Sequence, residues 1–421
     1  MPGTARRFWI ETLGCPKNEV DSDKLARTLL DDGLVPAGTP DDAELVVVNT
    51  CAFIEQARRE SIDTIFELSE RRRPEAEMLV TGCMAERYGR ELAEALPEAT
   101  VAGAGVPVDI ATRAASTAVP TRDLLELPRP RQRVPWAYVK VAEGCDKACG
   151  FCSIPLFKGR QRSRDLAGIL AEVDSLQVRE VILVAQDLGS FGRDRGTDQL
   201  VELVSALGSR VDWVRLLYLH PAELTDALIE AILSTGVPYF DLSLQHVSGS
   251  LLSRMRRFGN ADVFRGRIDA IRSAEPRAAL RSNFIIGYPG ETDADHDQLV
   301  EFLHAVQLDW CGFFAFSNEE GTYAAGLDGA IDPLLVSERM AELQEIQESI
   351  TSSRREALVG SKVTVLVDCR GQARSYREAP GIDGIVSVPA SLDPGQMAEV
   401  EVVDAVGPDI IARGAVAELV S

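Results

Sequence analysis

The sequence predicts a mixed α/β protein built from three folding units: an α/β parallel-sheet unit, a larger unit of six β/α pairs and a small all-β barrel. Three observations predict this order. Apolar runs alternate with helical patterns over about the first 115 residues, and the alternation resumes on a larger scale from Trp136 to about residue 355. Beyond residue 360 the chain is Val-rich and punctuated by Gly, with no long helical pattern.

The N-terminal unit is expected to contain three buried strands, in "RRFWIETLG", "AELVVVNTC" and "AEMLVTGC". Helical patterns over residues 21–33 and 53–73 separate them. A β-α-β series of this kind predicts a parallel sheet. The stretch that follows holds Pro120 and three further prolines among arginines, a composition that opposes both helix and strand, and it predicts a linker.

Six apolar runs predict the strands of the central unit, with helical patterns such as 166–178, 222–235, 261–274, 293–307 and 336–358 between them. The runs are "WAYVKVAE", "EVILVAQD", "WVRLLYLH", "YFDLSLQH", "LRSNFIIGYPG" and "DWCGFFAFS". Six β/α pairs form either a partial barrel or a doubly wound sheet. Both alternatives place chemistry at the carboxyl ends of the strands.

Short Val-rich runs after residue 360, such as "SKVTVLVDCR" and "AEVEVVDAVG", predict an all-β barrel of about 60 residues. The expected domains are therefore residues 1–118, a linker over 119–135, a central domain over 136–355 and the β-barrel over 356–421. With 421 residues and 45% apolar content, the chain can bury more than one core.

The formal net charge of -21 opposes a nucleic-acid surface and suits a basic protein partner, although acidity can also serve solubility alone. The first ten residues hold no apolar run of signal-peptide length, and no stretch is long enough to span a membrane. We therefore expect a cytoplasmic protein without a membrane partner. Its eight cysteines should stay reduced there, which favours metal ligation or redox chemistry over disulfides.

Cys145, Cys149 and Cys152 lie within "GCDKACGFC", directly after the first predicted strand of the central unit. Zinc sites with three thiolates and no neighbouring His are unusual, and soft thiolates also favour iron-sulfur clusters, which normally take four cysteines. Three cysteines would leave one iron open to a substrate. The spacing resembles the signature of radical S-adenosylmethionine (SAM) enzymes, in which the open iron binds SAM.

Cys15, Cys51 and Cys83 each follow an apolar run of the N-terminal unit. Because the carboxyl ends of parallel strands meet at one edge, these thiols can converge and hold a second cluster. Buried cysteine is also a common small core residue, so the pattern leaves both alternatives open. Cys311 and Cys369 lie inside predicted strands without partners, and both are expected to be core residues.

The whole chain resembles the methylthiotransferases, which join a cluster domain, a radical SAM domain and a TRAM domain. The motifs "LGCPKN", "VNTCAF", "TGCMAE", "LQHVSGSLLSRMRR" and "SNEEGTYA" occur in that family's order. The resemblance implies two 4Fe-4S clusters and SAM as cofactors, the central unit being a radical SAM partial (β/α)6 barrel. It implies that the cluster on Cys145, Cys149 and Cys152 cleaves SAM to a deoxyadenosyl radical, and that the cluster on the other three cysteines holds the sulfur.

Within the family, "NTCAFIEQARRESID" and "SYREAPGIDGIV" look like the branch that modifies an aspartate of the twelfth protein of the small ribosomal subunit. The β-barrel is itself acidic, with five Lys or Arg against nine Asp or Glu from Lys362 to Ser421, which suits a basic ribosomal protein. A transfer-RNA methylthiotransferase and a non-catalytic iron-sulfur scaffold are the alternatives. The resemblance also implies a flavodoxin- or ferredoxin-like electron donor and no RNA contact except through the ribosome.

Several residues at predicted strand ends are candidates for SAM contacts, although each could instead serve a turn or core packing. Phe151 lies where related enzymes contact the adenine, and His246 is considered as a proton carrier. In "KGRQRSR" an extended backbone would aim four basic residues to one side, and we expect one or two, Arg162 among them, to bind the SAM carboxylate or the target aspartate unless the face is merely solvated. The remaining candidates are Gln186, Asp187, Gln245, Gly287 and Gly290.

Overall fold

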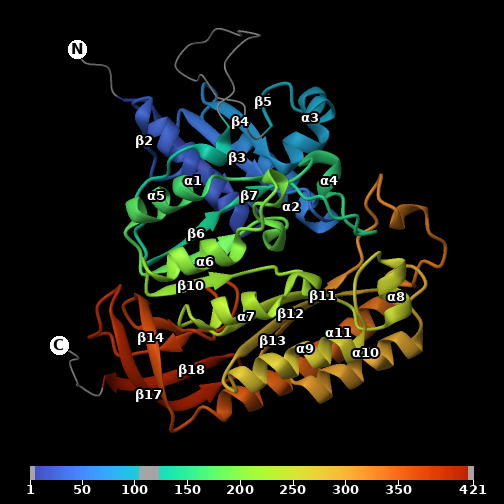
Figure 1. Cartoon of the computed structure of the whole chain (residues 1–421). Coiled ribbons are helices and arrows are strands. Elements are labelled where there is room, and N and C mark those ends of the chain that lie inside the picture. The colour runs from blue at the N-terminus through green and yellow to red at the C-terminus, as the bar shows by residue number, and fades with distance from the viewer. Residues whose placement is uncertain (1–4, 104–122, 416–421) are drawn as a thin grey trace.

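A computed structural model describes residues 5–103 and 123–415 of the chain. In Figure 1 the N-terminal unit is blue, the central unit runs from green to orange, and the C-terminal β-barrel is red. The mixed α/β class expected from the sequence is confirmed. The predicted domain boundary at residue 118 and Pro120 of the predicted linker lie outside the described residues.

The N-terminal unit is a five-stranded parallel sheet in the order β2-β1-β3-β4-β5. Its three long strands match the predicted apolar runs, whereas the two-residue edge strands are too short for a sequence pattern to reveal. Helix α1 begins earlier than its pattern predicted, because Pro16 occupies its first turn and needs no hydrogen-bond acceptor there. The elements are β1 Arg7–Thr12, α1 Pro16–Asp31, β2 Val35–Pro36, β3 Leu45–Thr50, α2 Glu55–Arg71, β4 Glu77–Gly82, α3 Cys83–Ala95 and β5 Thr100–Val101.

All six strands predicted for the central unit are present and run parallel in two sheets, β10-β9-β6 and β11-β12-β13. An isolated bridge between Leu219 and Leu242 joins β10 to β11. The strands therefore follow one another in sequence order around an arc, which is a partial barrel; the doubly wound alternative is wrong, because its order would reverse at a switch point. The strands are β6 Trp136–Lys140, β9 Glu180–Val184, β10 Trp213–Leu216, β11 Tyr239–Gln245, β12 Ala279–Ile286 and β13 Trp310–Ala315.

Helices cover the outside of the arc, and the apolar faces of strands and helices share one buried core that includes Leu183, Phe240 and Phe302. A short antiparallel hairpin, β7 Ala142–Glu143 with β8 Arg162–Ser163, flanks the cysteine loop. No described helix combines the length and the apolar composition needed to cross a bilayer. The helices are α4 Ile154–Phe157, α5 Leu166–Leu176, α6 Leu200–Gly208, α7 Asp226–Leu233, α8 Gly249–Arg254, α9 Ala261–Ala274, α10 Asp293–Val306 and α11 Pro333–Glu356.

The C-terminal unit is a closed barrel in the order β14-β15-β16-β18-β17, as the Val-rich pattern predicted. Inward-facing residues such as Val365, Val400 and Ile410 are fully buried and form a core of their own. The strands are β14 Lys362–Cys369, β15 Gln372–Ser375, β16 Val386–Ser387, β17 Met397–Val406 and β18 Asp409–Ala415. Short 3-10 helices lie at Pro40–Asp42, Leu124–Glu126, Leu188–Ser190, Arg193–Arg195, Pro221–Glu223 and Ala324–Gly326.

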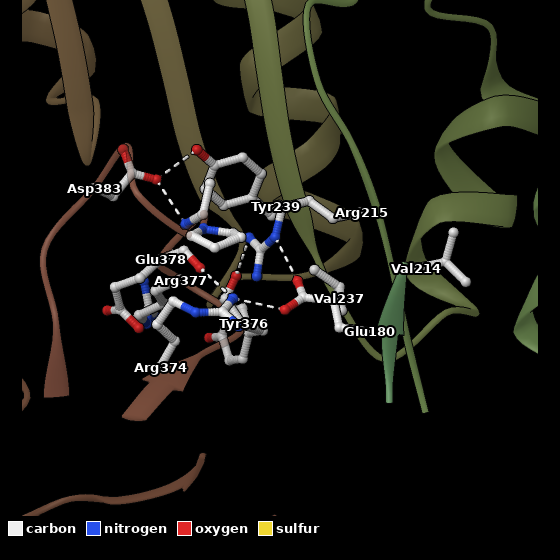
Figure 2. A network of polar contacts seen from close by, with 12 residues as sticks. Glu180, Val214, Arg215, Val237, Tyr239, Arg374, Tyr376, Arg377, Glu378 and Asp383 are labelled. Carbon is white, nitrogen blue, oxygen red and sulfur yellow. Dashed lines mark hydrogen bonds and ion pairs between the residues drawn. The ribbon is translucent and has the colours of Figure 1, made fainter. Parts of the chain in front are cut away.

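The β-barrel and the loop after β15 close the amino end of the partial barrel through a buried ionic network (Figure 2). Glu180, the first residue of β9, accepts from Arg215 Nε at 2.8 Å and from Arg374 Nη1 at 2.6 Å. Tyr239, the first residue of β11, donates its hydroxyl to Asp383 at 2.6 Å. Since this end is filled by the chain itself, a site must be sought at the opposite, carboxyl end.

Candidate active site at the carboxyl ends of the strands

Three of the predicted cysteines follow the three central strands of the N-terminal sheet. Cys15 precedes α1, Cys51 directly follows β3, and Cys83 is the first residue of α3 directly after β4. Neighbouring strands end in register, with Thr50 opposite Gly82. The three thiols are therefore placed along one edge of the sheet, as the sequence predicted.

Close approaches between the turns bring these cysteines together. A Cβ added to Gly14, next to Cys15, would lie 2.9 Å from the Cys51 Sγ, so only glycine allows this contact. Gly82, with φ of +88°, would place a Cβ 2.6 Å from the Thr50 carbonyl oxygen. Both glycines let two cysteine-bearing turns touch.

Asn18 on α1 lies at the centre of the three turns. Its Nδ2 donates to Leu13 O at 2.7 Å and to Thr50 O at 3.1 Å, and its Oδ1 accepts from the Cys83 thiol at 3.9 Å. One amide thus holds the ends of β1, β3 and β4 in place. Sequence inspection did not single out Asn18, although it stands three residues after Cys15.

Burial and the neighbouring thiols both disfavour the ionised form of Cys51 and of Cys83. Burial raises the pKa of Cys51 and raises that of Cys83 to about 12; the Cys15 thiol adds to both shifts, and Lys158 opposes the second. Without a cation the thiolates repel one another in a dry site. A bound metal reverses this balance and deprotonates its thiol ligands.

The second trio lies on the loop between the β7 strand and α4. Cys145 N donates to Gly159 O at 3.1 Å, and Cys152 N donates to Cys149 O at 3.2 Å, so the loop folds back on itself. Burial is the largest cause that raises the pKa of Cys145 to about 11 and that of Cys152 to about 12. Each shift also contains a contribution from the Cys149 thiol, as expected for three neighbouring sulfurs.

Two segments that are distant in the sequence form hydrogen bonds with this loop. Gly150 N donates to Met255 O, and Ala324 N donates to Gly150 O, both at 2.8 Å. Arg257 donates through Nη1 to the Cys149 Sγ at 3.4 Å and through Nη2 to Ser243 O. Arg257 lies more than a hundred residues from the cysteine motif, so local sequence could not connect it to the cluster site.

A buried chain of ion pairs runs between the two trios. Lys140 pairs with Asp21 of α1 at 2.8 Å and with Glu143, while Lys158 pairs with Glu143 at 3.0 Å and with Glu86 of α3 at 2.8 Å. Burial alone would raise the pKa of Glu143, but the two ammonium groups lower it to about 2. These charges fasten the N-terminal unit to the partial barrel at the cysteine edge.

The predicted SAM contacts Gln186 and Asp187 follow β9 at this edge. Gln186 Nε2 donates to Glu143 at 2.9 Å, while its buried Oε1 has no hydrogen-bond partner in the described part of the chain. Asp187 is buried, which raises its pKa, and it accepts from Ser190 at 2.8 Å. A buried acceptor without a donor is costly unless a ligand supplies one, so Gln186 suits a binding role. Both assignments stay predictions.

Gln245 ends β11 with φ of +72°, at a shift in strand register, and Tyr218 near the end of β10 has φ of +64°. Non-glycine residues rarely adopt this conformation, and such strain gathers at functional sites. The neighbouring His246 is fully buried; its Nδ1 accepts from Ser248 N at 3.0 Å, and burial lowers its pKa to about 4. The hydrogen bond and the lowered pKa favour a structural His246, but its buried Nε2 has no hydrogen-bond partner in the described part of the chain, so the proton carrier considered from sequence stays a prediction.

Phe151 packs against the core of the partial barrel, and its predicted adenine contact stays a prediction. Gly287 and Gly290 both have positive φ, of +80° and +86°. A Cβ on Gly287 would lie 2.4 Å from Val336, and one on Gly290 would lie 3.0 Å from Arg254. Packing against protein side chains therefore accounts for both glycines, whatever their predicted role toward a ligand.

The expectation that four basic residues after the cysteine loop point to one side is wrong. Lys158 directly follows the short helix α4 and its side chain is buried, Arg160 is exposed, and Arg164 is buried against Glu172 at 2.7 Å. A helical turn and a bend replace the extended backbone that the alternation assumed. Arg162 is half-exposed and pairs with Asp123, so its role toward SAM or substrate stays a prediction.

The two remaining cysteines differ. Cys311 in β13 packs against the core of the partial barrel, as expected. Cys369 ends β14 and is exposed, so its assignment to the core is wrong. Val365 and Val367 of the same strand face the barrel core, but the strand register shifts between Val367 and Cys369, so the alternation does not continue to the strand end.

The donor sets fit iron-sulfur clusters. Within residues 5–103 and 123–415, no three His, Cys, Asp or Glu side chains are close enough to share a single metal ion. A 4Fe-4S cluster binds each cysteine through a different iron, so its ligands stand farther apart than those around one zinc ion. Two trios of thiols, each lacking a fourth cysteine, suit two clusters with one open iron each.

Three family models match the chain in succession. They are described as uncharacterized protein family UPF0004 over residues 7–103, the radical SAM superfamily over residues 139–303 and the TRAM domain over residues 359–414. The first contains Cys15, Cys51 and Cys83, and the second contains the other trio.

Curated relatives match nearly end to end. The chain is 41% identical to the ribosomal protein uS12 methylthiotransferase RimO of Cutibacterium acnes, over 96% of the chain and 97% of the relative. It is 40% identical to the protein of the same name from Moorella thermoacetica, over 94% and 96%. Among solved structures, the radical SAM methyltransferase TsrM of Kitasatospora setae aligns over 74% of the chain and 72% of that protein, with 15% identity and a TM-score of 0.48.

Proposed function

Because the chain belongs to the RimO family of ribosomal protein uS12 methylthiotransferases, we propose that it adds a methylthio group to the β-carbon of an aspartate in ribosomal protein uS12. The enzyme is a radical SAM methylthiotransferase, and its cofactors are two 4Fe-4S clusters and SAM. When bound, these cofactors supply a radical able to take hydrogen from an unactivated C-H bond, sulfur for insertion, and a methyl group.

Each cluster has its own ligands in this proposal. Cys145, Cys149 and Cys152 bind the cluster that activates SAM, and Cys15, Cys51 and Cys83 bind the cluster that serves sulfur insertion. The assignment is supported by the contacts of the two loops and by the thiol chemistry of both sets. Our candidates for SAM contacts are Phe151, Gln186, Asp187, Gln245, Gly287, Gly290 and Arg162.

The surrounding side chains have the tasks of orientation and water exclusion. Arg257 donates to the Cys149 Sγ and brings positive charge to a sulfur that becomes anionic with a cluster bound. Gln186 is oriented by Glu143, which leaves its Oε1 free to accept from a ligand. The buried Lys140 and Lys158 compensate charge between the two trios and keep that region dry.

The observation that most supports a protein substrate over transfer RNA is the pairing of the β-barrel's cations. All five Lys and Arg from residue 362 to residue 415 are engaged with carboxylates of the chain itself. A surface that binds RNA phosphates needs free cations to displace counterions. An acidic enzyme with paired cations instead suits a basic ribosomal protein. The pairs are Lys362–Glu399, Arg370–Asp393, Arg374–Glu180, Arg377–Asp309 and Arg413–Glu401.

The test is the anaerobically purified enzyme with SAM, a reductant and either uS12 or transfer RNA. We expect about eight irons per chain and a methylthio group on one aspartate of uS12 by mass spectrometry. Cys51→Ala should halve the iron and stop methylthiolation while SAM cleavage continues, whereas Cys149→Ala should halve the iron and stop both. Cys369→Ala is the matched control, because this thiol is exposed on the β-barrel. Modified transfer RNA with unmodified uS12 would overturn the substrate, and four irons in the wild type would overturn the second cluster.

Three further assignments belong to the proposal. We place the domain divisions after residues 118, 135 and 355, the first of which lies outside the described residues. A flavodoxin- or ferredoxin-like protein would supply the electrons. The cytoplasm is the compartment in which the eight cysteines stay reduced and the ribosomal substrate is found.

A further inference from the structure

Arg87 connects the two cysteine trios through a single nitrogen. It lies four residues after Cys83 on α3, so both side chains occupy the same face of that helix. Its Nη1 donates to Ala52 O at 3.1 Å and is 3.3 Å from Ser153 Oγ. Ala52 directly follows Cys51, and Ser153 directly follows Cys152. One guanidinium therefore contacts the neighbours of cysteines from both trios.

A buried carboxylate fixes the position of this guanidinium. Glu319, in the loop after β13, lies 2.6 Å from Arg87 Nη1 and 2.5 Å from Arg58 Nη1, and its side chain is only 3% exposed. Ser317 Oγ donates to the other carboxylate oxygen at 2.5 Å, and Glu55 N, at the start of α2, donates to Ser317 Oγ at 3.1 Å. The loop after β13 is thereby tied to α2 and α3 of the N-terminal unit.

Burial and close contacts restrict the Arg87 side chain to few rotamers. Its side chain is 8% exposed, and its guanidinium lies 5.1 Å from the ring centre of Tyr88 and 6.0 Å from that of Phe157. Phe157 belongs to α4, which follows the second cysteine trio. A cation enclosed by two rings and three oxygen acceptors has few alternative rotamers.

We propose that Arg87 is a positioning residue that sets the separation and relative orientation of the two cluster sites. The inference rests on the proposed assignment of the six cysteines. Arg87 contacts backbone and side chains next to the ligands rather than the sulfurs themselves, so its loss should leave both sites able to bind iron. Sulfur held at one site must reach the radical centre generated at the other, and a misplacement of about 1 Å can lower a rate by about 100-fold.

The variant Arg87→Met is expected to fold, because Arg58 still pairs with Glu319 and no buried carboxylate is left without a cation. We expect its iron content and its SAM cleavage to 5′-deoxyadenosine to stay within about twofold of wild type, while methylthiolation of uS12 falls by about 100-fold. Electron paramagnetic resonance of the reduced protein should show a changed spin-spin interaction between two intact clusters. Arg87→Lys retains a cation with three donors on one nitrogen and should recover part of the methylthiolation.

Arg90→Met is the matched control, since Arg90 lies on the same helix, is 87% exposed and lies 4.0 Å from Glu94. It should match wild type in every measurement. Arg58→Met removes the other cation on Glu319 but keeps the contacts beside the cysteines, and it should lower methylthiolation less than Arg87→Met. Unchanged methylthiolation in Arg87→Met, or a parallel loss of iron, would overturn the inference. Failure of the proposed function would instead appear in the wild type, as four irons or an unmodified uS12.

Discussion

The two ends of the partial barrel differ in what their buried polar groups pair with. At the amino end, Glu180, Arg215, Arg374 and Asp368 form successive ion pairs between 2.6 and 2.8 Å, and the Arg215 guanidinium also stacks 4.4 Å from the ring centre of Tyr239. At the carboxyl end lie thiols that repel one another, a buried acceptor on Gln186 that has no donor within residues 5–103 and 123–415, and strained backbone at Gln245.

We infer from this difference that the amino end serves stability and the carboxyl end serves the reaction. At the amino end Glu180 and Asp368 are held by arginines, although Arg215 Nη2 has no hydrogen-bond partner among the described residues, and these ion pairs join the β-barrel to the central unit (Figure 2). Unsatisfied groups and strain persist only where the surrounding fold over-determines them. The comparison predicts that changes at the carboxyl end alter iron binding and turnover with little loss of stability, and that changes at the amino end do the reverse.

Gly144→Ala should have the largest effect on the chemistry. Gly144 precedes Cys145 with φ of +80°, and an added Cβ would lie 2.2 Å from the backbone oxygen of Arg160. The cysteine loop must move, so we expect the iron to fall from about eight to about four per chain and SAM cleavage to be lost. Gly159→Ala is the control: its φ is +72°, but nothing lies within 4 Å of the added atom. Equal iron in both variants would contradict the steric argument.

Arg374→Met tests the opposite end. The change leaves Asp368 unpaired and Glu180 with one cation fewer in a buried site, which typically costs about 3–5 kcal/mol in the free energy of unfolding. Urea unfolding measures this loss, and iron content and SAM cleavage of the folded fraction should match wild type. Arg370→Met, on the exposed side of the same β-barrel, should change stability by less than about 0.5 kcal/mol. A stable Arg374→Met protein that loses SAM cleavage would break the distinction between the two ends.

Arg257→Met returns to the carboxyl end with a smaller change. Removing the donor to the Cys149 Sγ withdraws positive charge from a cluster ligand, so the cluster should become harder to reduce. SAM cleavage at a fixed reductant strength should fall by about 10-fold, and the midpoint potential followed by electron paramagnetic resonance should move to a more negative value. An unchanged midpoint potential together with an unchanged rate of SAM cleavage would show that Arg257 has no role in the function of the cluster.

Much of the arrangement could be predicted from local sequence. Short apolar runs identified all six strands of the central unit, which are four to eight residues long, because their length and flanking turns exclude helices. The rule that parallel strands end at one edge brought Cys15, Cys51 and Cys83 together across long stretches of chain. Both inferences depend on periodicity and topology, which a single sequence contains.

Contacts between distant segments could not be predicted in this way. Glu319 pairs with arginines of α2 and α3 that lie more than two hundred residues earlier in the chain. Arg257 donates to Cys149, more than a hundred residues away. The alternation in "KGRQRSR" failed because Lys158 continues the helical conformation after α4 and the backbone bends at Arg160. The two-residue strands β2 and β5 exist only because neighbouring strands supply their partners.

The smallest expected effect concerns His246, which sharpens the comparison because it lies at the carboxyl end yet is expected to affect stability alone. The charges around it come from Asp295, His296 and Arg339, and burial is the largest cause that lowers its pKa from 6.5 to about 4. Since the folded state holds the proton less tightly than the unfolded chain, stability is complete above pH 6.5 and falls as the pH drops from 6.5 toward 4. Between pH 7.5 and pH 5.5 the loss should be about 1 kcal/mol.

His246→Asn should remove that part of the pH dependence, because an asparagine oxygen can still accept from Ser248 N and does not titrate. The measurement is the free energy of unfolding of wild type and variant at the two pH values, under anaerobic conditions. His304→Asn, at an exposed position on α10, is the matched control and should retain the wild-type dependence. If His246→Asn instead abolishes methylthiolation at full stability and full iron content, His246 takes part in the chemistry. A local hydrogen bond on one side of a buried group would then not exclude a functional role at this end.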